Sequence, residues 1–98
     1  ATRSALLPQV PTVAEQGYPG FDVPTWFGLV GPAKLPKDVV AALAKSAAEG
    51  LRGAAVAERF AQIGAEPAPN TPERFAEYIA AETARWGKVI RDKKITAE

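Results

Sequence analysis

The carboxylates are the first candidates for chemistry in this chain, because it contains no histidine and no cysteine. Glu73 and Glu77 share one face of an expected helix. That spacing is more typical of a solvated surface than of an acid–base pair, which needs two carboxylates facing each other across a cleft. Glu82 differs because it falls within an apolar helical stripe beside Arg85 and Trp86. We interpret Glu82 as an ion-pair partner of Arg85, with a catalytic carboxylate as the less favoured alternative.

The residue types of this chain give little support for nucleophilic catalysis or for metal binding. Ser4 and Ser46 are the only serines, and neither has a histidine to activate it or a lysine three positions later. The three aspartates are too few for a calcium or magnesium cage, and the usual zinc ligands are missing. The glycine spacing does not match a phosphate-binding loop. We therefore predict a protein that is not an enzyme, with no cofactor and no bound metal.

The composition is that of an ordinary globular domain and argues against several partners. The chain has 98 residues, of which 47% are hydrophobic and 23% charged, and its net charge is +1. Such a small net charge gives no field able to hold nucleic acid or an anionic membrane. No apolar run is long enough to cross a bilayer, and the first residues lack the pattern of a signal peptide. We expect one domain and no nucleic-acid partner.

Helix signals occupy the second half of the chain. Apolar spacing predicts helices over residues 37–52, 54–63 and 71–93. The last helix has a strong start, with Thr71 as N-cap, Pro72 at the first position and Glu73 beside the positive end. Further upstream, Thr12 and Glu15 form a capping-box pattern, which predicts a short helix that ends at Gly17.

One strand is expected among these helices. The residues from Thr25 to Val30 are β-branched, aromatic or apolar, apart from Gly28, and both alternating faces are apolar. This pattern is typical of a strand covered on both sides in an α/β layer. The stretch from Ala65 to Pro69 is a candidate for a short second strand at an edge. The chain itself supplies too few other strands to complete a sheet.

The order of these features resembles one family over nearly the whole chain. It is similar to the C-terminal third of the substrate-binding receptors of tripartite tricarboxylate transporters, also called Bug-type periplasmic binding proteins. The positions that carry the resemblance are Arg3, Leu7-Pro8, Val10-Pro11-Thr12, Glu15, Gly17-Tyr18-Pro19, Trp26, Gly28, Pro32, Pro36-Lys37-Asp38-Val39-Val40, Gly64-Ala65, Thr71-Pro72 and Trp86.

The resemblance implies an α/β fold, as the C-terminal fragment of a two-lobed periplasmic-binding-protein (type II) architecture. Residues 1–24 would form a lobe-crossing loop with a short helix. Residues 25–98 would supply the strand and three main helices that pack on the first lobe. The implied function is a periplasmic receptor that delivers small organic carboxylates to membrane transporter subunits. Thr2, Arg3 and Ser4 would lie near the ligand cleft, and the guanidinium of Arg3 suits a carboxylate. The rest of the ligand site would lie upstream of Ala1.

An alternative of a different class is a non-enzymatic helical module that binds a partner protein or a second copy of itself. Its support is the doubly apolar segment at residues 25–30 and the long stripe of helix 71–93, which 98 residues cannot easily cover. On either interpretation we expect the isolated chain to self-associate and not to bind small carboxylates usefully.

Overall fold

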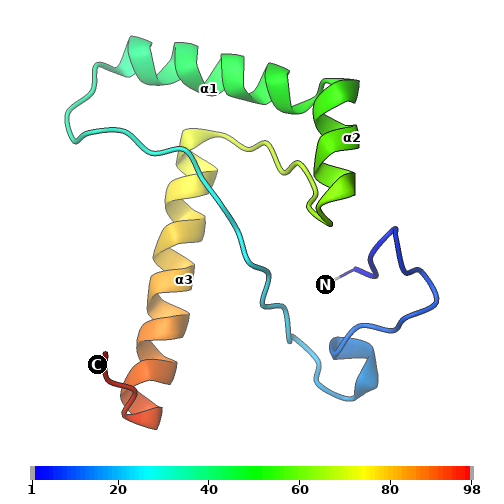
Figure 1. Cartoon of the computed structure of the whole chain (residues 1–98). Coiled ribbons are helices and arrows are strands. Elements are labelled where there is room, and N and C mark those ends of the chain that lie inside the picture. Colours follow the sequence, from blue (N-terminus) through cyan, green and yellow to red (C-terminus); the bar gives the residue numbers. More distant parts are fainter. Residues whose placement is uncertain (1, 98) are drawn as a thin grey trace.

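The computed structural model describes residues 2–97, and within that range the regular structure is entirely helical. A single 3₁₀ turn, η1 (Ala14–Gln16), precedes the helices α1 (Lys37–Leu51), α2 (Ala54–Gln62) and α3 (Pro72–Lys93). Helix α1 contacts both α2 and α3, while residues 18–36 form a long connection that crosses in front of α3 (Figure 1). The three predicted helices are therefore confirmed, with ends that differ by a residue or so.

The start of α3 follows from local capping chemistry. Thr71 Oγ1 accepts a hydrogen bond from the Arg74 amide at 3.2 Å, and Pro72, which has no amide hydrogen, fills the first helical position. At the other end Lys94 adopts a left-handed conformation with φ 52°, and the Ile95 amide returns to the Ile90 carbonyl. This end is a Schellman motif, which satisfies carbonyls that the last turn would leave without partners.

The same motif ends α2, and a capping box orders the N-terminal segment. Gly64, with φ 70°, allows the Ala65 amide to reach the Phe60 carbonyl at 2.9 Å. Upstream, the Glu15 amide donates to Thr12 Oγ1 at 3.2 Å, while Glu15 Oε2 accepts from the Thr12 amide at 2.7 Å. The predicted capping box is confirmed, although the helix that follows it is only the 3₁₀ turn η1.

The predicted strand is wrong, and with it the α/β fold class. Neither residues 25–30 nor residues 65–69 form a strand, and no sheet occurs anywhere in residues 2–97. A strand exists only through hydrogen bonds to a neighbouring strand, and the amides of residues 23–35 find no backbone partner among the described residues. The side chains of this segment favour a β-strand. The described part of the chain offers no neighbouring strand with which the segment could pair.

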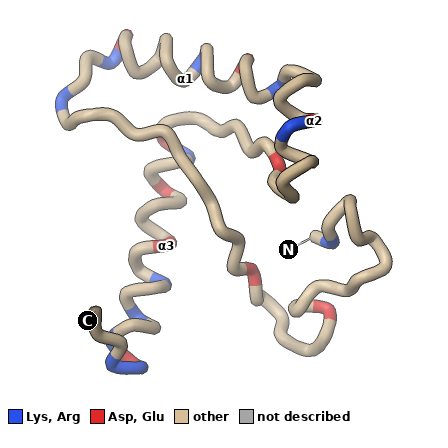
Figure 2. The backbone as a smooth tube through the Cα atoms, viewed as in Figure 1, with Lys and Arg blue, Asp and Glu red and all other residues tan. Residues whose placement is uncertain are grey.

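Instead, the connecting segment packs against α3 in the opposite direction to the helix. The ring of Trp26 meets Phe75 and Tyr78 edge to face, with centroid distances of 5.7 Å and 5.3 Å. Gly28 lies so close to Phe75 that an added Cβ would fall 2.1 Å from the tip of the ring. Between Asp22 and Lys34 the segment carries no charged residue (Figure 2). This docking is the main long-range packing of the segment.

The chain has far more exposed surface than a compact domain of its size. Its accessible area is 8464 Å², whereas a compact 10.3 kDa protein is expected to expose about 5,400 Å². Its radius of gyration is 16.7 Å, against about 13 Å for a compact domain of this length. None of the described residues is fully buried. The excess of roughly 3,000 Å² is surface that these helices do not cover.

Candidate functional site

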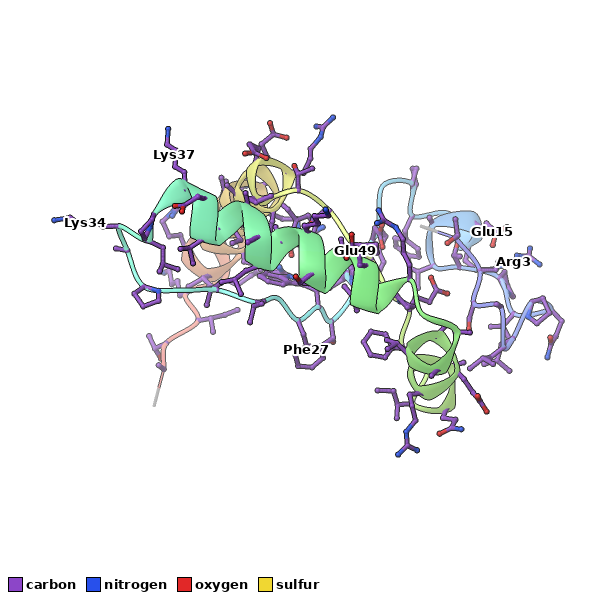
Figure 3. The ribbon with its side chains drawn as sticks, turned by 90° about the horizontal axis from the view of Figure 1, so that it is seen from above. Arg3, Glu15, Phe27, Lys34, Lys37 and Glu49 are labelled. Atoms are coloured by element: carbon purple, nitrogen blue, oxygen red, sulfur yellow. The ribbon has the colours of Figure 1, made fainter. Side chains whose placement is uncertain are left out.

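The three residues expected near a ligand lie on the N-terminal loop, and Arg3 is held by an internal carboxylate. Its Nε donates to both oxygens of Glu15, at 3.1 Å and 2.9 Å, and its Nη1 donates to the Pro8 carbonyl at 3.2 Å. Figure 3 shows Arg3 and Glu15 side by side on this loop. The ion pair closes the loop from residue 3 to residue 15 at its base.

The pairing shifts the pKa values of both groups, although both side chains are exposed to solvent. The hydrogen bond from Arg3, followed by the Thr12 amide, lowers the pKa of the Glu15 carboxyl to about 2. In return, the hydrogen bond and charge of Glu15 raise the pKa of Arg3 above its usual value. Their side chains are 43% and 45% exposed. The guanidinium of Arg3 is therefore already paired with a carboxylate of the same loop.

Ser4 stabilises the turn that follows Arg3. Its Oγ accepts a hydrogen bond from the Leu6 amide at 3.3 Å, and its carbonyl accepts from the Leu7 amide at 3.1 Å. Thr2 is exposed. A hollow of about 80 Å³ lies between residues 4–6 of this loop and residues 61 and 64–66 after α2. Small-molecule sites normally enclose about 300 Å³ or more, so this hollow is too small to enclose a tricarboxylate.

The contact between Arg3 and Glu15 was missed at the sequence level. Glu15 was interpreted only as half of the capping box, and a loop contact across 12 positions has no periodic signature. A signal did exist, because both positions are among those on which the resemblance to the tricarboxylate receptors rests. Two shared residues of opposite charge at the ends of one loop are good candidates for a pair.

The second polar cluster centres on Glu82 and explains why that residue lies in an apolar stripe. Glu82 Oε2 accepts from Trp86 Nε1 at 3.0 Å, and Oε1 lies 2.6 Å from Arg85 Nη2. Arg85 Nη1 also donates to the Asp22 carbonyl at 2.7 Å, and its Cζ lies 5.3 Å from the centre of the Trp86 ring. The predicted pair of Glu82 and Arg85 is confirmed. Because both oxygens of Glu82 serve this packing, the cluster supplies no free carboxylate for catalysis.

A larger open hollow lies between α1 and the start of α3. Its volume is about 290 Å³, and it is lined by Ala44, Lys45, Ala48, Arg52 and residues 69–72. Lys45 and Arg52 are both exposed. The Arg74 amide at the helix start already donates to Thr71 Oγ1. Within residues 2–97 no group of three or more acidic side chains is placed to hold a metal ion. None of the described helices has the length and hydropathy of a membrane span.

Comparison with known proteins gives a consistent result. The chain is 39% identical over 90 residues to the protein BugT of Bordetella pertussis, covering 92% of this chain and 28% of BugT. It is 38% identical over 96 residues to a UPF0065 protein from the tcbD-tcbE intergenic region of Pseudomonas sp. strain P51, covering 97% of this chain and 29% of that protein. A UPF0065 protein of Agrobacterium vitis is 33% identical over 93 residues, which is 92% of this chain and 27% of the relative.

The chain thus spans less than a third of the length of these relatives. No solved structure gives a significant match. The family described as tripartite tricarboxylate transporter family receptor matches residues 1–95, which is almost the whole sequence. The chain therefore belongs to the tripartite tricarboxylate transporter receptor family.

Proposed function

We propose that residues 1–98 are the C-terminal portion of a periplasmic receptor that delivers small organic carboxylates to the membrane subunits of a tripartite transporter. The family match over residues 1–95 carries this proposal. The excess of exposed surface supports it, because a portion of a larger protein leaves open the surface that the rest would cover. Such a receptor binds and releases its ligand unchanged, which agrees with a Glu82 carboxylate committed to packing.

Within such a receptor, residues 1–24 form the segment that crosses between the lobes, and residues 25–98 pack on the first lobe through their helices. The loop that Arg3 and Glu15 close then holds one edge of the ligand cleft. This placement rests on the family match over residues 1–95, and contacts within the loop hold its shape. Its two ends are joined by an ion pair, and its turn is held by Ser4 Oγ.

Arg3 is the residue of this loop best suited to a carboxylate ligand. Guanidinium groups bind carboxylates through charge-assisted hydrogen bonds, and Arg3 Nε already donates to both oxygens of Glu15. Nε and Nη1 already donate to Glu15 and to the Pro8 carbonyl, so Nη2 is the nitrogen that would donate to a ligand carboxylate. Thr2 and Ser4 flank Arg3 in the sequence and carry hydroxyl groups.

The test is titration calorimetry on a receptor-length polypeptide that contains residues 1–98, against a panel of di- and tricarboxylates. We expect micromolar binding of at least one ligand. Arg3→Ala should weaken the affinity for that ligand about tenfold or more, which is the contribution of one charge-assisted hydrogen bond. Arg74→Ala is the matched control, because the Arg74 side chain pairs with the exposed Glu77 on its own helix and its loss should leave the affinity unchanged.

Glu15→Gln separates a ligand contact from a purely structural role of Arg3. If Arg3 binds the ligand, removing the competing charge of Glu15 should maintain or increase the affinity. If Arg3 only closes the loop, Glu15→Gln and Arg3→Ala should weaken binding alike, and the ligand role is refuted. The 98-residue chain alone should not bind these ligands at micromolar concentration. Micromolar binding by the chain alone would place the site elsewhere, and no binding by the longer polypeptide would refute the substrate class.

A further inference from the structure

We draw no further inference here: the strongest candidate, the exposed apolar patch of Phe27, Leu29 and Val30 on the segment that packs against α3, belongs to a chain that spans less than a third of its relatives, and nothing in residues 2–97 shows what covers it.

Discussion

Arg85 is the residue that ties the connecting segment to α3, so its removal is the most informative perturbation. Its hydrogen bond to the Asp22 carbonyl joins positions 63 residues apart, and its second arm holds Glu82 on its own helix. Trp86 lies beside both groups. Arg85→Ala should therefore loosen the segment from α3 and leave the helix itself intact.

The magnitude follows mainly from the hydrogen bond to Asp22. A hydrogen bond from a charged donor contributes about 1.5–3 kcal/mol. The pair with Glu82 adds only about 0.3–0.5 kcal/mol, because the Arg85 side chain is 38% exposed and solvent screens it. We expect the docked state to lose about 2 kcal/mol, which is roughly a 30-fold change in the ratio of docked to undocked chains. Arg85→Lys should recover about half, because one ammonium cannot satisfy both acceptors.

Urea titration followed by two circular dichroism signals measures this loss. The near-ultraviolet signal reports the docking of Trp26 on Phe75 and Tyr78, and the far-ultraviolet signal reports helix. With a slope of about 1–2 kcal/mol per molar urea, Arg85→Ala should lower the near-ultraviolet midpoint by roughly 1–2 M. Arg74→Ala is the control on the same helix, since its pair with Glu77 is exposed. If Arg85→Ala and Arg74→Ala behave alike, Arg85 does not hold the segment.

Two further predictions concern local capping and pH. Thr71→Ala removes the acceptor for the Arg74 amide and should cost about 1 kcal/mol, seen as roughly fivefold faster hydrogen exchange of that amide. Thr83→Ala, whose hydroxyl donates to the Ile79 carbonyl in mid-helix, should not change that exchange rate, and equal effects would contradict the capping role. The Glu15 carboxyl, with its pKa lowered to about 2 from an unfolded value near 4.3, stabilises the loop fully above about pH 4.3 and loses this effect as the pH falls towards 2. Carbon-detected NMR titration should place the Glu15 midpoint near 2 and move it upwards in Arg3→Ala; a midpoint that Arg3→Ala leaves unchanged would rule out the pair as its cause.

Short-range contacts of the polar clusters could be predicted from the sequence, and long-range ones could not, as particular residues show. Arg3 was expected to lie near a ligand carboxylate, and that expectation stays a prediction; in the structure its guanidinium pairs with Glu15 of the same loop. Glu82 was expected to pair with Arg85 because the two lie three positions apart on a helix. The reach of Arg85 to the Asp22 carbonyl was missed, since no spacing rule connects positions so far apart.

The sequence by itself determined the features that depend on neighbours within a few residues. The start of α3 at Thr71 and Pro72, the capping box of Thr12 and Glu15, and the end of α2 at Gly64 all follow from short-range hydrogen bonds and allowed backbone angles. Only the tertiary structure decided the conformation of residues 25–30. Their composition favours a strand, but a strand needs a neighbouring backbone, and none is present among residues 2–97. The segment therefore docks on α3 through Trp26, and Phe27 is left in solvent, because pairing depends on contacts that local preference cannot supply.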